Sequence, residues 1–256
     1  MYLYQILQKY NARNLTAYTT LLSQLQTTLQ AWASSCYVSI SNSGSRAKGT
    51  AISLASDVDY LVSLTSNCNE NNGGLRAIYN SLYTKLAGIY SSVRKQNVSI
   101  RIDLNGLAVD ITPARKQPGN TNDHSLYVSK LDTWKQTNIQ KHITDISQSG
   151  RINEIKLIKI WRELHNLDFP SIYLEYLLIN NILLNKSKNI NSLTDNAWHV
   201  LTELAKSTDN PLFSRVVDPA NSANILSDLL TTVEKNKIIS QAQIAVRQTN
   251  WNKIVW

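Results

Sequence analysis

Two neighbouring segments, SGSRAKGT at residues 43–50 and SDVDYLV at residues 56–62, organise the whole chain. The first is a short glycine-serine turn, and the second is typical of a strand that carries two carboxylates two positions apart. Because side chains alternate along a strand, Asp57 and Asp59 face one way while the apolar residues between and beyond them face the other. The apolar set predicts a buried face, so the two acids lie together on the opposite face.

This combination indicates a site for a divalent metal and phosphate. Two carboxylates so close together repel each other unless a cation lies between them. In the turn, glycine lets the backbone approach a ligand, and successive N–H groups can form an anion-binding concavity. Ser45 adds a hydroxyl, while Arg46 and Lys48 add positive charge and are weaker candidates for phosphate or acceptor contacts. The turn is not a P-loop, because Thr50 directly follows Gly49 where a P-loop requires lysine first.

The composition favours an acidic partner. The 256 residues carry a formal charge of +8, which suits nucleotides, RNA or DNA. The basic residues form no continuous run, so an ordinary basic surface is the alternative interpretation. No apolar run approaches the ~18 residues of a membrane-spanning helix, and nothing resembles a signal peptide. We therefore expect a cytoplasmic protein without a membrane partner.

Cysteine and histidine usage predicts neither a disulfide framework nor a zinc cluster. Cys36 and Cys68 are too few and too far apart for a disulfide framework or a zinc cluster. The four histidines are scattered without ligand spacing.

Hydrophobic periodicity predicts a mixed first half and a helical second half. In the first half we expect a helical region over residues 3–33, strands at 36–40, 57–64, 98–102 and 107–111, and a helix over 75–89, with the β-rich part ending at residues 113–120. Asn105-Gly106 favours a two-residue hairpin turn between the last two strands. From about residue 133 onward we expect helices, over residues 139–146, 152–161, 170–184, 194–205 and 220–246. The fold class is α+β, with domains at 1–130 and 131–256.

A third acid lies on the second strand of the predicted hairpin. Asp110 faces away from the apolar residues on either side of it, as Asp59 does on its own strand. Asp103 competes for the same role, but it ends the first hairpin strand beside the turn, where acids are common for structural reasons.

The pattern Gly44-Ser45, Asp57-x-Asp59 and Asp110 resembles the DNA polymerase β-type nucleotidyltransferase superfamily. Its motif is GS, then [DE]-x-[DE] on a strand, then a third carboxylate on a neighbouring strand. The later sequence more narrowly resembles the 2′-5′-oligoadenylate synthase and cGAS/DncV-like (CD-NTase) group. The segments that carry this resemblance are VDITPA at 109–114, LIKIW at 157–161, PSIYLE at 170–175 and VDPAN at 217–221.

The resemblance implies a polymerase-β-like palm, a mixed β-sheet flanked by helices, followed by a helical domain, with the active site in the cleft between them. Asp57, Asp59 and Asp110 would hold two Mg²⁺ ions, for which Mn²⁺ can substitute. One ion would activate an attacking ribose hydroxyl, and the other would stabilise the leaving pyrophosphate. The zinc-binding insertion of the animal DNA sensor is absent, which implies no zinc.

The same resemblance assigns the phosphate contacts. Gly44 and Ser45 would hold the β- and γ-phosphates, and Lys159, with Lys156 and Ser171, would bind the triphosphate from the helical half. Each assignment has a structural alternative. Ser45 could cap a helix, the lysines could lie on a solvated helix face with a Lys159–Glu163 pair, and Ser171 could simply start a helix after proline.

Three further features have their own interpretations. Ile172 stands where many bacterial relatives have an aromatic that stacks on the base, with Tyr173 one position later. Asp218-Pro219 is typical of a helix entry, and Trp251 and Trp256 are expected to pack.

The function that the resemblance implies is Mg²⁺-dependent joining of nucleoside triphosphates, ATP first among them, into a short linear or cyclic oligonucleotide. This product would be a second messenger in bacterial anti-phage signalling, and RNA or another activator could be a partner. Two alternatives remain open: template-independent addition to an RNA 3′ end, as in CCA-adding and poly(A)-adding enzymes, and a catalytically silent nucleotide- or RNA-binding protein.

Overall fold

The computed structural model describes residues 1–55, 58–69, 73–119 and 121–256. The chain forms two compact units, each assembled from separate segments. The sheet unit consists of Arg13–Lys48 and Ser56–Ile143, and the helical unit of Met1–Ala12, Gly49–Ala55 and Thr144–Trp256. The predicted division at residue 130 follows chain order, whereas the observed units each draw on more than one stretch of the first half of the chain.

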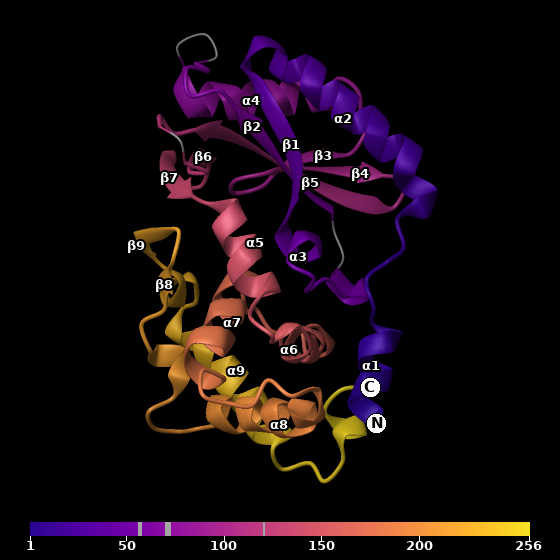
Figure 1. Ribbon diagram of the computed structural model, residues 1–256, viewed down its shortest axis with the longest axis vertical. Coiled ribbons are helices and arrows are strands. Elements are labelled where there is room, and N and C mark those ends of the chain that lie inside the picture. The colour runs from indigo at the N-terminus through magenta and orange to yellow at the C-terminus, as the bar shows by residue number, and fades with distance from the viewer. Residues whose placement is uncertain (56–57, 70–72, 120) are drawn as a thin grey trace. The chain divides into compact units, whose positions relative to one another are not determined.

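The sheet unit is built on a mixed sheet, as predicted (Figure 1). In the described part of the chain its seven strands are β1 (Tyr37–Ser43), β2 (Val58–Leu64), β3 (Val93–Lys95), β4 (Ile100–Leu104), β5 (Leu107–Lys116), β6 (His124–Val128) and β7 (Thr133–Thr137). The strand order is β1-β2-β5-β4-β3, and β6 pairs with both β5 and β7. The β2–β5 pair is parallel, and the other pairs are antiparallel.

The alternation predicted for the acid-bearing strands is confirmed on the core face of the sheet. Val58, Tyr60 and Val62 are buried, as are Val109 and Ile111 on the parallel neighbour. Helices α2 (Thr19–Ala33) and α4 (Gly74–Ala87) cover this face (Figure 1) and contribute leucines, an isoleucine and a tyrosine to the same apolar cluster. Burial of one face leaves the acids on the other.

The hairpin is confirmed, but the β-rich part extends further than predicted. Asn105 and Gly106 both have positive φ, and Leu104 pairs with Leu107 across the turn. Strand β5 does not end at Pro113: its pairing with β4 stops at Ile111, and its pairing with β6 starts at Arg115. The proline, which lacks an N–H, therefore lies where the strand changes partner.

The N-terminal region is also divided differently from the prediction. Helix α1 (Tyr2–Lys9) belongs to the helical unit, and α2 begins only at Thr19 in the sheet unit. The sequence pattern showed helical spacing on both sides of this break but not the break itself.

The helical unit buries a separate apolar core beneath its helices. The helices of this unit are α1, the end of α5 (Ile139–Ser147), α6 (Ile152–Leu164), α7 (Ser171–Leu177), α8 (Leu193–Leu204) and α9 (Thr232–Ala245). Trp161, Tyr173 and Tyr176 are among its largest buried side chains. Among the described residues, no helix has both the length and the apolar character needed to cross a bilayer.

The predicted helix over 220–246 is wrong in its first third. Strands β8 (Val217–Asp218) and β9 (Asn221–Ile225) form a hairpin there. Asp218 shapes its turn by accepting from the Ala220 N–H at 2.9 Å, so Asp218-Pro219 is not a helix entry. Helix α9 begins later, after a capping box between Thr231 and Glu234.

The sequence did not predict that the two cysteines pair with each other. Cys36 and Cys68 form a disulfide, with their Cα atoms 5.4 Å apart. Strands β1 and β2 are antiparallel, so Tyr37 at the start of β1 pairs with Leu64 at the end of β2. Cys36 directly precedes Tyr37 and Cys68 follows Leu64, so this pairing brings the two cysteines together. Distance along the chain was therefore the wrong criterion for this pair.

Candidate active site

One row of side chains crosses the face of the sheet that is not packed against α2 and α4. Ser43 on β1 pairs with Asp59 on β2, Asp59 pairs with Asp110 on β5, and Asp110 pairs with Arg101 on β4. Because paired positions on neighbouring strands share a face, the two acids lie next to each other, on strands whose backbones are about 4.8 Å apart. Asp57, the first acid of the predicted Asp-x-Asp pair, lies outside the described residues.

Gly44 rests directly against one of these acids. Its φ is +64°, and a Cβ atom there would lie 2.0 Å from the Asp59 Oδ2 atom. Only glycine fits, both for its left-handed backbone and for this close approach. The turn and the acid are therefore held together, as the sequence pattern predicted for a phosphate and metal site.

The short helix that follows, α3 (Gly44–Ala47), begins after Ser43, which occupies its N-cap position. Ser45 thus lies inside the first turn of α3 and is not its cap. Arg46 Nη2 donates to the Arg13 carbonyl at 3.0 Å. Burial and the nearby Arg13 charge lower the pKa of Arg46, and the Asp59 carboxylate opposes them. Lys48 is buried, so it does not belong to an ordinary solvated surface.

Arg101 is a functional candidate that the motif search missed. Its Nε donates to Asp110 Oδ1 at 2.9 Å, and its Nη2 donates to Asp110 Oδ2 at 2.5 Å. Such a two-point contact fixes the orientation of the carboxylate. Asp103, the rival third acid, instead accepts from the Gly106 N–H at 2.8 Å in the hairpin turn. The structure therefore places Asp110, and not Asp103, beside Asp59.

The donor set on this row suits a hard divalent cation, since Mg²⁺ prefers carboxylate and phosphate oxygens. Within the described ranges, no three histidine, cysteine, aspartate or glutamate side chains are grouped to hold a metal. Asp59 and Asp110 supply two carboxylates, and Asp57 is the sequence-based candidate for the remaining one. A cation at Asp110 would share that carboxylate with Arg101.

In the helical unit, Lys159 forms a buried ion pair. Its side chain is 3% exposed, and its Nζ lies 2.6 Å from Oε1 of Glu175, which is 0% exposed. Thr50 completes the group, because its hydroxyl donates to the same Glu175 oxygen at 2.9 Å and accepts from the Lys159 ammonium at 2.9 Å. The alternative of a solvated face with a Lys159–Glu163 pair is wrong, since Glu163 pairs with Arg162. A triphosphate contact for Lys159 stays a prediction.

Ser171 makes a separate polar contact with α6. It starts α7 after Pro170, and its hydroxyl accepts from Arg162 Nη1 at 3.0 Å. Lys159 and Arg162 lie three residues apart on α6, and Ser171 and Glu175 lie four apart on α7, so two polar contacts run side by side between these helices. The available signal was the position of these two charged residues: Arg162 directly follows the LIKIW segment, and Glu175 ends the PSIYLE segment.

Other predicted positions lie nearby or pack elsewhere. Lys156 Nζ donates to Asn11 Oδ1 at 3.4 Å, and burial lowers the pKa of Lys156. Tyr173 is buried, and its hydroxyl donates to the Leu212 carbonyl, so it does not offer a stacking surface. Trp251 and Trp256 pack edge-on against Trp198 and His165, which confirms their predicted packing role.

Comparisons with known proteins give a family for the chain. A family model described as the Second Messenger Oligonucleotide or Dinucleotide Synthetase domain matches residues 6–149. A search of curated proteins finds no match.

Solved structures share the fold across most of the chain. CdnC of E. coli MS115-1 with ATP superposes with a TM-score of 0.71 at 21% identity, covering 96% of this chain and 89% of that one. The CD-NTase CdnG of Bradyrhizobium diazoefficiens in complex with GTP gives 0.68 at 12% identity, covering 91% and 86%. The CdnE cyclic dinucleotide synthase of Elizabethkingia meningoseptica with GTP and Apcpp gives 0.65 at 13%, covering 93% and 92%.

Proposed function

Because the chain belongs to the Second Messenger Oligonucleotide or Dinucleotide Synthetase family, we propose that it joins nucleoside triphosphates, ATP first among them, into a short linear or cyclic oligonucleotide second messenger of anti-phage signalling. The resemblance to the CD-NTase group is thereby confirmed, and the chain is a nucleotidyltransferase. The observation that carries the proposal is the row of Ser43, Asp59 and Asp110, with Gly44 pressed against the Asp59 carboxylate. Structures of CdnC with ATP and of CdnG with GTP support nucleoside triphosphates as substrates.

In the proposed reaction, a ribose hydroxyl of one nucleotide loses its proton and attacks the α-phosphorus of another. The bond between the α-phosphorus and the bridging oxygen breaks, and pyrophosphate leaves. Asp57, Asp59 and Asp110 would hold two Mg²⁺ ions, or Mn²⁺, which supply activation of the hydroxyl and charge stabilisation when bound. Arg101 keeps the Asp110 carboxylate in one orientation.

The triphosphate would be bound by neutral and cationic groups together. The backbone of Gly44 and the hydroxyl of Ser45 would bind its terminal phosphates, because Gly44 lies against the Asp59 carboxylate and Ser45 follows it in the first turn of α3. Lys156, Lys159 and Ser171 are proposed as further triphosphate contacts. For Lys159 this requires the phosphate to compete with Glu175 for the ammonium.

The test is incubation of the purified protein with each radiolabelled nucleoside triphosphate, and with all four, in Mg²⁺ or Mn²⁺ and without RNA. We expect a phosphatase-resistant product that disappears with a chelator and in Asp59→Asn and Asp110→Asn. Asp103→Asn is the matched control, since the amide oxygen of the new side chain can still accept from the Gly106 N–H. Its product yield should match that of the unmodified protein.

Two results would contradict the proposal. One is that no product forms without RNA and that label enters RNA when RNA is then added, which indicates terminal transfer to an RNA 3′ end. The other is equal product from the protein with and without Asp59 and Asp110. Where product does form, nuclease digestion would give its linkage and show whether it is cyclic.

A further inference from the structure

A cavity of about 230 Å³ opens on the same sheet face as the acid row. Leu61 and Ser63 line it, two and four positions beyond Asp59 on β2, which places them roughly 7 and 13 Å farther along the strand. The cavity is smaller than the ~300–1,000 Å³ of sites for drug-sized ligands, so it suits one ring system. All of its lining residues belong to the sheet unit.

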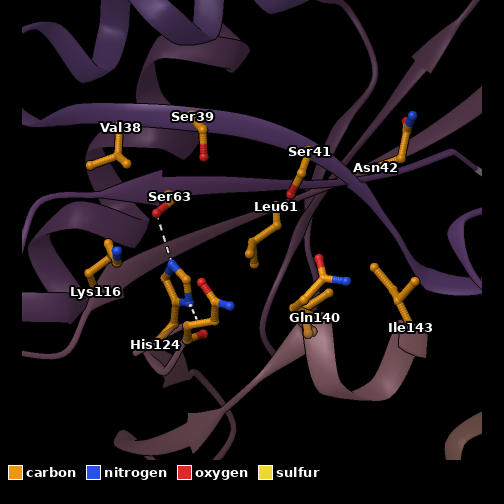
Figure 2. A pocket seen from close by; sticks show the side chains of 12 residues that line it. Val38, Ser39, Ser41, Asn42, Leu61, Ser63, Lys116, His124, Gln140 and Ile143 are labelled. Atoms are coloured by element: carbon orange, nitrogen blue, oxygen red, sulfur yellow. Dashed lines mark hydrogen bonds between the residues drawn. The ribbon is translucent and has the colours of Figure 1, made fainter. Parts of the chain in front are cut away.

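The hydrogen bonds at its inner wall are fixed in direction. His124 Nδ1 lies 2.9 Å from the Asn122 carbonyl, which can only accept, so Nδ1 carries the proton. Burial lowers the pKa of His124, which keeps the ring neutral and leaves Nε2 as an acceptor. The Ser63 hydroxyl therefore donates to His124 Nε2 at 2.8 Å (Figure 2). With its proton committed, the Ser63 oxygen can only accept from a ligand.

The rest of the cavity has the chemistry of a base-binding site. Leu61, Ile139 and Ile143 provide an apolar surface against which a flat ring can pack, and Ser41 and Gln140 provide polar groups at its rim. The acids lie at one side on the same face. A phosphate held there would leave its ribose and base within reach of the cavity.

We propose that this cavity holds the purine base of one nucleotide and that Ser63 accepts a hydrogen bond from its 6-amino group, which favours adenine over purines that carry a carbonyl or only hydrogen at that position. This inference rests on the proposed function. A base with a carbonyl or only hydrogen at that position would leave the buried Ser63 oxygen without a donor. His124 is a positioning residue, since it acts by directing the Ser63 proton.

The first experiment is competition between ATP and purine riboside triphosphate, which lacks the 6-amino group, for incorporation into product. We expect a preference for ATP of about tenfold in the unmodified protein, because one buried hydrogen bond is lost with the analogue. Ser63→Ala should reduce this preference to near equality. Ser66→Ala, an exposed serine just after the same strand, should keep it.

His124→Phe is the second variant, because it retains a ring but releases the Ser63 proton. We expect it to accept inosine triphosphate, whose 6-carbonyl can now receive that proton, at a rate several-fold closer to ATP than in the unmodified protein. Circular dichroism melts would verify that each variant is folded. An unchanged ATP preference in folded Ser63→Ala would overturn the proposal.

Binding of radiolabelled adenosine, measured by equilibrium dialysis without metal, separates this inference from the proposed function. Adenosine should bind the unmodified protein and the Asp59→Asn/Asp110→Asn protein equally, and bind Ser63→Ala about tenfold more weakly. If no oligonucleotide forms but this pattern holds, the reaction is wrong and the base site stands. If product forms while Ser63→Ala binds adenosine as tightly as the unmodified protein, the base site is wrong and the reaction stands.

Discussion

Replacing Lys159 with methionine should destabilise the protein strongly. The substitution takes the cation away from the Glu175 carboxylate, which is 0% exposed, and the neutral Thr50 hydroxyl that donates to the same oxygen cannot replace that charge. Breaking a buried ion pair by removing one partner costs about 3–5 kcal/mol. For a chain of this size we expect a fall in Tm of roughly 6–20 °C.

The second variant, Lys159→Met/Glu175→Gln, removes both charges and keeps an oxygen that accepts from Thr50. Because no uncompensated charge remains, it should recover most of the lost stability. Urea unfolding followed by circular dichroism measures both variants. A loss below about 1 kcal/mol in the single variant, or a double variant no more stable than the single, would refute the reasoning.

The matched control is Lys206→Met. Lys206 and Glu203 form a pair at a similar distance, 2.5 Å, but the lysine side chain is 44% exposed. An exposed pair contributes about 0–1 kcal/mol, so this change should be nearly neutral. The double variant also separates the two roles of Lys159: if the lysine binds triphosphate, that folded protein should show a raised KM for ATP.

Three further predictions follow from the sheet unit. Gly44→Ala should abolish product formation and cost at least ~1–2 kcal/mol in urea unfolding, because its Cβ would collide with the Asp59 carboxylate in a left-handed backbone. Reduction of the Cys36–Cys68 disulfide, whose cysteines are 32 residues apart, should lower the unfolding free energy by about 3–4 kcal/mol, with Cys36→Ser/Cys68→Ser insensitive to dithiothreitol. Since the pKa of His124 is lowered in the folded state, the unfolded state binds more protons below pH ~6.5. Stability should therefore fall as pH drops from about 6.5 toward that folded-state pKa, and His124→Phe should lack this dependence.

The parts of the site that depend on residues near in sequence can be predicted from local signals. The Asn105-Gly106 turn fixes the hairpin register, and counting outward from it places Arg101 opposite Asp110. The Arg101–Asp110 contact was therefore within reach of sequence reasoning. The motif search missed it because it considered acids and phosphate ligands, and not their partners.

Pairings between distant segments could not be predicted in the same way. Lys159 was placed on the correct helix, but Thr50 reaches it from a segment 109 residues away. The disulfide likewise depends on how β1 and β2 pair, and the β8–β9 hairpin depends on an aspartate turn whose sequence also suits a helix entry. For Thr50 and the disulfide the deciding contact is tertiary, whereas for the hairpin it is a local turn between Asp218 and Ala220 that hydrophobic periodicity does not encode.

The position of the acids nevertheless follows from the core more than from the chemistry of the site. Parallel pairing of β2 with β5 aligns Val58 with Val109 and Tyr60 with Ile111, all buried, and this alignment puts Asp59 beside Asp110. A register slip of one residue would turn every one of these side chains to the opposite face, which burial forbids. The apolar residues thus hold the carboxylates in place against their mutual repulsion. It follows that replacing the acids with asparagine should leave the fold intact, so loss of product in those variants would report on chemistry.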